Sequence, residues 1–203
     1  MDSSTLWSFV LYAVVTIVTP GPNNVMVTAC GLNFGFRRTL PAVFGICFGF
    51  AVMVFLVGLG VGTLVGTSGK LFEVVRWLGI AYLLYLAFRL ATAGTVNMNS
   101  TSEKPWGFWP AVLFQWVNPK GWAMILGAVA AYTSGLCGVA IYLCLAGVYF
   151  VVGLPGIALW ALMGDALRHV LSDPGKVRWF NLAMAAFLVW SVWGAIKEGL
   201  GLA

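Results

Sequence analysis

Six apolar stretches, each about as long as a bilayer is thick, constrain this chain more than any other feature of its sequence. A membrane-spanning helix needs about 20 mainly apolar residues. Charged residues make up only 8% of the chain, whereas a soluble domain carries about 25%. So few charges could not cover a water-facing surface, so the sequence predicts an all-α integral membrane protein and excludes a cytosolic globular domain. The stretches run approximately over residues 6–31, 39–65, 71–90, 106–132, 138–163 and 179–196.

Length and charge set the domain organisation and exclude one class of partner. Six spans use about 120 residues, so the rest of the 203 residues suffices for helix ends and short loops. We therefore expect a single transmembrane domain over residues 1–203. The formal net charge of +5 does not indicate nucleic-acid binding in such a chain, because excess Lys and Arg in membrane proteins gathers in cytoplasmic loops.

The distribution of basic residues predicts how the spans are oriented. The loops after the first, third and fifth stretches, with the adjoining span ends, hold seven Lys or Arg, whereas the opposite side holds three. Because cytoplasmic loops carry the basic excess, this count places the first group in the cytoplasm and both termini outside. The first group is Arg37, Arg38, Arg89, Lys104, Arg168, Lys176 and Arg178, and the second is Lys70, Arg76 and Lys197.

Two of the six stretches are interrupted by proline at matching positions. Pro20 and Pro119 lie 99 residues apart, close to half the chain length. A shift by this distance lays the first stretch on the fourth, the second on the fifth and the third on the sixth. Since each half holds an odd number of spans, we expect two inverted three-helix repeats, at about 1–95 and 104–203. Inverted repeats with broken helices at matching positions indicate a transport site, although two unrelated proline kinks would give the same spacing.

The first interruption breaks the helical hydrogen-bond ladder twice within one turn. Pro20 and Pro22 each lack a backbone N–H, and Gly21 between them permits unusual backbone angles. A broken backbone at membrane depth is tolerated only where it faces protein or a water-filled cavity. Asn23 and Asn24 follow with amide donors and acceptors, beside a helix N-terminus whose N–H groups and dipole favour a carboxylate.

The second interruption carries the one charge that lies deep inside an apolar stretch. Lys120 follows Asn118 and Pro119 near the middle of residues 106–132. A lysine at mid-membrane costs about 2.5–3.5 kcal/mol even on lenient insertion scales, and such a residue indicates a functional site by default. The alternative is a structural lysine whose ammonium group binds the carbonyls freed by Pro119.

Together the interruptions predict a site for a molecule that carries both a carboxylate and an ammonium group. The half-helix N–H groups and Lys120 would hold the carboxylate, while Asn23, Asn118 and freed carbonyls would hold the ammonium group. The predicted substrate-binding residues are Pro20, Gly21, Pro22, Asn23, Asn24, Gln115, Asn118, Pro119 and Lys120. Three aromatic residues are candidates for the wall of the side-chain pocket, although ordinary packing would also explain them: Phe114, Trp116 and Trp122.

Other polar residues and the glycine motifs are explained by packing. Asp165 and Arg168 stand three apart, as do Glu73 and Arg76, so we expect local helix pairs. GxxxG repeats indicate close helix contacts, without saying whether those contacts lie within one chain or between two. The repeats are Gly31/Gly35, Gly45/Gly49, Gly58/Gly62 and Gly62/Gly66.

Several of these motifs, taken together, resemble those of a known family, the LysE/RhtB amino-acid exporters. The combination of a PGP[DN]-type motif in the first span with an NPK triplet in the fourth is specific, and the resemblance covers nearly the whole chain. The matching segments are TPGPN at 19–23, GFRR at 35–38, GICFG at 45–49, LGIAYLLYL at 78–86 and NPK at 118–120.

The resemblance implies a secondary carrier, not an enzyme, that exports amino acids or close derivatives across the bacterial cytoplasmic membrane. It also implies antiport against an ion gradient, with protons the expected ion, and a homodimer within the lipid; we expect no cofactor and no metal site. Many family members have Asp where this sequence has Asn23, so a carboxylate that would carry protons or bind a substrate amine is missing. Proton coupling would then fall to Lys120 or Asp165.

Three other functions stay open at this point. A metal-ion exporter of the same superfamily would want mid-membrane Asp, Glu or His ligands, which the sequence lacks. A thiol–disulfide electron carrier would want a cysteine in each interruption, and neither holds one. A purely structural membrane protein leaves the interruptions unexplained. The cysteines are expected to be small buried hydrophobes, and they are Cys30, Cys47, Cys137 and Cys144.

Overall fold

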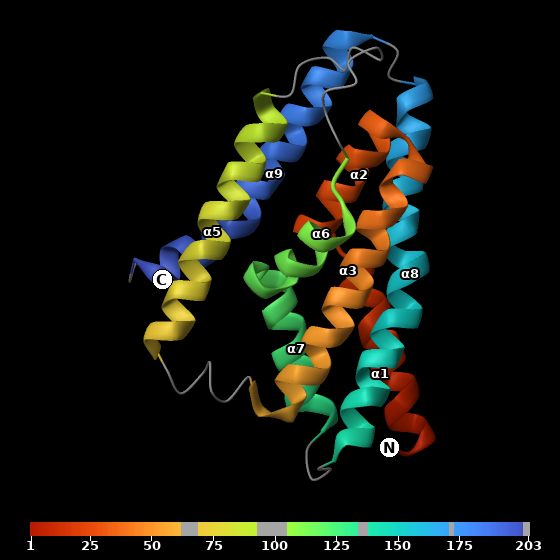
Figure 1. Ribbon diagram of the computed structural model, residues 1–203, viewed down its shortest axis with the longest axis vertical. Coiled ribbons are helices and arrows are strands. Elements are labelled where there is room, and N and C mark those ends of the chain that lie inside the picture. Colours follow the sequence, from red (N-terminus) through yellow and green to blue (C-terminus); the bar gives the residue numbers. More distant parts are fainter. Residues whose placement is uncertain (62–68, 93–104, 134–137, 171–172, 201–203) are drawn as a thin grey trace.

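The computed structural model describes residues 1–61, 69–92, 105–133, 138–170 and 173–200, and every regular element within these ranges is a helix (Figure 1). The all-α prediction is confirmed for this part of the chain. The elements are α1 (Ser3–Val18), α2 (Pro22–Phe34), α3 (Phe36–Leu56), the π-helical turn η1 (Val57–Val61), α5 (Gly69–Thr92), α6 (Phe108–Phe114), the 3-10 turn η2 (Gln115–Val117), α7 (Pro119–Tyr132), α8 (Val139–Val170) and α9 (Pro174–Gly199).

Within the described residues, each of the six apolar stretches coincides with a helix or with a broken series of helices. By length and apolar composition, α3 and α8 are able to cross a membrane, and α1 with α2 would make a third span, bent by 54°. The described residues therefore give two spans, or three with the bent pair. The other stretches form α5, the series α6–η2–α7, and α9, and the six-span arrangement stays a prediction.

The helices form a larger group and a separate pair. In the larger group α2 and α3 both pack along α8, α1 packs against α8, and α6 packs against α3. Figure 1 shows α5 and α9 side by side and set apart from this group. α5 touches the group through η2, and α9 touches it through α2. The pair therefore contacts the group at both interrupted segments.

Glycines set the closest contacts between helices. A Cβ added to Gly31 of α2 would overlap the carbonyl oxygen of Ala161 on α8, and one added to Gly45 of α3 would overlap that of Phe108 at the start of α6. The predicted close contacts are thus confirmed at these two positions, and they lie within one chain. Two positions of the predicted repeats lie outside the described residues: Gly62 and Gly66.

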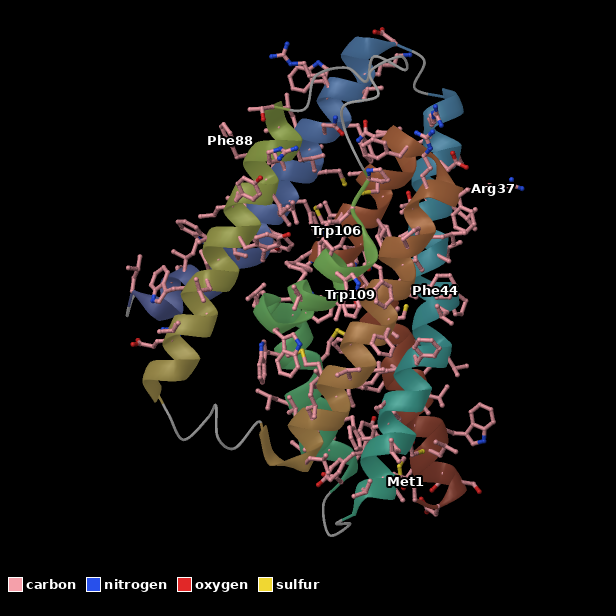
Figure 2. The ribbon with its side chains drawn as sticks, viewed as in Figure 1. Met1, Arg37, Phe44, Phe88, Trp106 and Trp109 are labelled. Carbon is pink, nitrogen blue, oxygen red and sulfur yellow. The ribbon has the colours of Figure 1, made fainter. Side chains whose placement is uncertain are left out.

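The outer faces of the long helices are apolar. Phe88 on α5 is 66% exposed, Val151 on α8 67% and Trp190 on α9 70%. Figure 2 shows Phe88 at the outer edge of the molecule, and Arg37 projecting near one end. Large exposed apolar faces are unfavourable in water, so these faces suit contact with lipid, in agreement with a membrane protein.

Two smaller predictions meet the structure directly. The Glu73–Arg76 pair is confirmed, with 3.4 Å between Oε1 and Nη2. Cys30 and Cys47 are buried thiols of the apolar core, as expected of small hydrophobes. Cys144 is a half-buried thiol, and Cys137 lies outside the described residues.

Candidate functional site

Both predicted interruptions are present, and in each a proline begins the second half-helix. α1 ends at Val18 and α2 begins at Pro22, whereas η2 separates α6 from α7, which begins at Pro119. Proline is well tolerated at the first position of a helix, because its missing N–H would have no helical partner there. The prolines therefore end one hydrogen-bond ladder and start another within the same apolar stretch.

Lys120 joins the two interruptions across about half of the chain. It lies in the first turn of α7, and its Nζ donates to the backbone carbonyl of Thr19 and, at 3.3 Å, to that of Pro20. These carbonyls follow the last turn of α1, where the negative end of the helix dipole favours a cation. The alternative considered from the sequence was a structural lysine whose ammonium group binds carbonyls freed by Pro119. In the structure the ammonium group of Lys120 instead binds carbonyls of the first interruption.

A reciprocal pair of side-chain amides forms a second link. Asn23 Nδ2 donates to Gln115 Oε1 at 2.9 Å, and Gln115 Nε2 donates back to Asn23 Oδ1 at 3.2 Å. Gln115 is fully buried and also donates to the carbonyl of Ala111 at 2.9 Å. Buried amides without partners are costly, so this pair stabilises the approach of α2 to η2.

The other two asparagines each satisfy backbone groups at a helix end. Asn24 Nδ2 donates to the carbonyls of Ile17 and Thr19, both at 2.9 Å, and so satisfies the end of α1. Asn118 is the N-cap of α7, and its Oδ1 accepts from the backbone N–H of Lys120 at 3.2 Å. Caps of this kind contribute about 1 kcal/mol.

A cavity lies where the interruptions meet, with about 440 Å³ of space between its atoms, part of it open to the outside. Lys120 is the only charged residue among those that line it. Of the predicted binding residues, the cavity brings together Gly21, Asn23, Asn24, Asn118 and Lys120. Four others do not line it and instead shape the chain around it: Pro20, Pro22, Gln115 and Pro119.

The remaining walls of the cavity come largely from helices that the sequence did not implicate. α8 contributes Tyr149, Gly153 and Ile157, four residues apart on one helix face. One sequence feature could have indicated that α8 lines the cavity: Tyr149 carries the only hydroxyl between residues 143 and 163. The other unpredicted lining residues are Thr16, Ile17, Ile46, Cys47, Phe50, Gly121 and Met124.

Of the two interpretations of the aromatic residues, the structure supports ordinary packing over a cavity wall. Phe114, Trp116 and Trp122 do not line the cavity. Phe114 packs edge-on against Trp106 in the core, with ring centroids 5.4 Å apart. Trp122 Nε1 donates to the carbonyl of Trp116 at 2.8 Å, so it satisfies the backbone of the 3-10 turn instead.

Gly21 leaves the space that the Lys120 side chain occupies. A Cβ at this position would lie 2.5 Å from Lys120 Cδ and 2.9 Å from Nζ. The backbone of Gly21 is extended, with φ −174°, so its conformation would accept other residues. The requirement for glycine here is therefore one of space.

Asp165, the other candidate for proton coupling, is not part of this cavity. It lies at the far end of α2, where a Cβ on Gly35 would be 3.4 Å from Asp165 Oδ1 and 3.1 Å from Arg168 Nη1. α2 has 13 residues and is therefore about 20 Å long. The structure thus keeps Asp165 and Lys120 at opposite ends of α2.

Comparisons with known proteins agree with one another. A family model described as LysE type translocator matches residues 14–191, which include both interruptions. The "Cysteine/O-acetylserine efflux protein" of Salmonella typhimurium is 30% identical, over 94% of this chain and 96% of that protein. The protein of the same name from Escherichia coli K12 is 28% identical over the same shares. No solved structure matches.

Proposed function

The chain belongs to the LysE type translocator family, and from that premise we propose that it exports a small amino acid or a close derivative across the bacterial cytoplasmic membrane. A translocator moves a solute without making or breaking its bonds, so the chain is a transporter and not an enzyme. Two named relatives are efflux proteins for cysteine and O-acetylserine. Both compounds are small zwitterions with a neutral side chain.

The observation that carries this proposal is the contact between Lys120 and the carbonyls of Thr19 and Pro20. It places two backbone acceptors beside a cation that lines a cavity whose other walls are mainly apolar. A zwitterionic amino acid complements both groups, because its carboxylate pairs with an ammonium group and its own ammonium group pairs with carbonyls.

In the proposed mechanism, substrate exchanges with this internal contact. The substrate carboxylate takes the ammonium group of Lys120, and the substrate ammonium group takes the carbonyls of Thr19 and Pro20. A molecule that lacks either charged group leaves one side of the broken contact without a charge-assisted hydrogen bond. The site therefore selects zwitterions over simple amines and simple acids.

The proposal includes the arrangement expected from the sequence. Six spans form two inverted repeats, at about residues 1–95 and 104–203, with both termini outside and the interruptions near the bilayer midplane. Sites of this kind are exposed alternately to the two sides of the membrane. Proton antiport, with Lys120 or Asp165 as the proton carrier, and a homodimer complete the proposal.

Export from loaded proteoliposomes tests the function. We expect labelled O-acetyl-L-serine to leave vesicles that contain the protein faster than empty vesicles. Unlabelled zwitterionic amino acids of similar size should compete, whereas the matched amine and the matched acid, each lacking one charged group, should not. Equal competition by all three classes, or no export of any labelled amino acid across a panel, would contradict the proposal.

A further inference from the structure

Tyr149 carries a buried hydroxyl that has no hydrogen-bond partner within the described part of the chain. Its side chain is 1% exposed, and it lines the same cavity as Lys120. A hydroxyl that is buried without a partner loses its hydrogen bonds to water and gains none in return. This residue therefore needs an explanation that packing alone does not give.

The ring of Tyr149 is held in place from two sides. Its centroid lies 4.9 Å from that of Phe50 and 5.3 Å from that of Phe9, and both pairs meet edge to face at 83°. Such contacts fix the orientation of an aromatic ring. The position of the hydroxyl is consequently fixed as well.

Neighbouring hydroxyls on α1 are different. Tyr12 donates to the carbonyl of Met124 at 3.2 Å, and Thr16 donates to the carbonyl of Tyr12 at 2.8 Å. The packing of this region therefore provides partners for hydroxyl groups in general. Among the buried hydroxyl groups that the structure describes, only that of Tyr149 is unpaired.

The same contrast holds among the side chains around the cavity. Every other lining side chain that bears oxygen or nitrogen makes a hydrogen bond to protein, and these are Thr16, Asn23, Asn24, Asn118 and Lys120. Among these described lining residues, only the side chain of Tyr149 makes no hydrogen bond to protein. Beside it the walls are apolar and aromatic, from Ile46 and Phe50 on α3 and Ile157 on α8.

We propose that the Tyr149 hydroxyl hydrogen-bonds the polar group of the substrate's side chain, so that the carrier prefers small amino acids with a neutral polar side chain over apolar ones of equal size. The inference rests on the proposed export function, in which the interruptions hold the two charged groups of the substrate. The substrate side chain then extends along the apolar walls to Tyr149. An ester carbonyl accepts the phenolic hydrogen there, and an alkyl chain leaves it unpaired.

The test compares wild type with Tyr149→Phe, which removes one oxygen and keeps the ring. O-acetyl-L-serine is the exported probe, and L-norleucine, which matches its side chain in length but lacks oxygen, is the competitor. Loss of one neutral hydrogen bond corresponds to about 3–10-fold in affinity. We expect the KM for O-acetyl-L-serine to rise by this factor in Tyr149→Phe, while the inhibition constant of L-norleucine stays the same or falls.

Tyr132→Phe is the matched control. Its hydroxyl donates to the carbonyl of Ser8 at 3.3 Å, and Tyr132 does not line the cavity, so the preference between the two probes should be that of wild type. Thermal unfolding without substrate is a second measurement. Because the Tyr149 hydroxyl has no partner, Tyr149→Phe should unfold at the wild-type temperature or above it.

With wild-type export intact, three results would overturn this inference and leave the proposed function standing. Two concern transport by Tyr149→Phe: an equal change in the KM for O-acetyl-L-serine and the inhibition constant of L-norleucine, or no change in either. The third is a clear loss of thermal stability in this variant, which would reveal a protein partner for the hydroxyl. Failure of wild type to export O-acetyl-L-serine or any other amino acid would instead overturn the proposed function, and this inference with it.

Discussion

The two interruptions occupy matching places in the two halves of the chain but present opposite chemistry. At the first, α1 and α2 meet at 54°, and the residue before α2 is Gly21, which provides no side-chain cap. The groups that this segment presents to Lys120 are the backbone carbonyls of Thr19 and Pro20. At the second, a 3-10 turn leads into a helix capped by Asn118, and what it offers is the side chain of Lys120.

Two interruptions at matching positions in the sequence can therefore supply different chemical groups to one site. One interruption supplies acceptors and the other supplies a cation, so each satisfies the other when no solute is present. A solute with both a carboxylate and an ammonium group matches the two together and neither alone. The following changes break or sharpen that division of roles, from the largest expected effect to the smallest.

Replacing Lys120 removes the donor side of the comparison. We expect Lys120→Met to abolish export while the protein still inserts and folds, because methionine fills a similar volume without the ammonium group. The loss of export is measured as efflux of labelled O-acetyl-L-serine from cells that express equal amounts of each protein. Lys197→Met, which changes an exposed lysine at the end of α9, is the control and should export normally. Wild-type export by a well-expressed Lys120→Met would refute the role of Lys120.

Enlarging Gly21 disturbs the contact from the acceptor side. A Cβ at this position overlaps the Lys120 side chain, so Gly21→Ala should push the ammonium group away from the Thr19 carbonyl. A displacement of about 1 Å in a positioned group costs up to about 100-fold in rate, and we expect export to fall by about 10-fold or more. Gly194→Ala, where an added Cβ meets nothing within 4 Å, should leave the rate unchanged. Equal rates for the two variants would show that Gly21 is not required for space.

The pH dependence of export and of substrate binding distinguishes the two candidate carriers of the coupling proton. Lys120 lies at the interruptions and Asp165 at the far end of α2. If Lys120 carries the proton, substrate binding by Lys120→Gln loses its pH dependence; if Asp165 does, the pH profile of export flattens in Asp165→Asn. The measurements are thermal shift with substrate and export at several pH values. An unchanged pH dependence in both variants would exclude both residues as the carrier.

The smallest effect is expected at the amide pair that holds the interruptions together. Gln115→Leu leaves the Asn23 amide without its partner and should lower the free energy of unfolding by about 1–3 kcal/mol. A double-mutant cycle of Asn23→Ala and Gln115→Ala should give a coupling energy of about 1 kcal/mol, measured by thermal unfolding in detergent. Additive effects would mean that the two amides do not stabilise each other.

The sequence predicted the interruptions because their cause is local. Pro22 and Pro119 lack an N–H, and this ends a hydrogen-bond ladder whatever surrounds it. The importance of Lys120 followed in the same way, from the cost of a charge inside an apolar stretch. Its partner did not follow, since the Thr19 carbonyl lies 101 residues away along the chain and is chosen by packing.

The walls of the cavity were beyond prediction for a related reason. α3 and α8 are apolar on all sides, because one side faces lipid and the other faces protein, so periodicity does not show which residues point inward. Phe50 looks no different in sequence from an exposed neighbour such as Phe48, and between residues 143 and 163 of α8 only the hydroxyl of Tyr149 set one position apart. The two interpretations of Trp122 stayed open for the same reason, because position next to an interruption does not determine on which side of the helix a ring lies.

The overlap of Gly31 with Ala161 has a consequence for motion. α2 meets α8 backbone to backbone there, and such a contact has no side chains that could yield. α1 meets α8 through side chains, with Ile17 packed over Gly156. If the 54° bend between α1 and α2 opens, α1 is therefore the arm that swings, about a hinge at Pro20, and it carries the Thr19 carbonyl away from Lys120 as it goes.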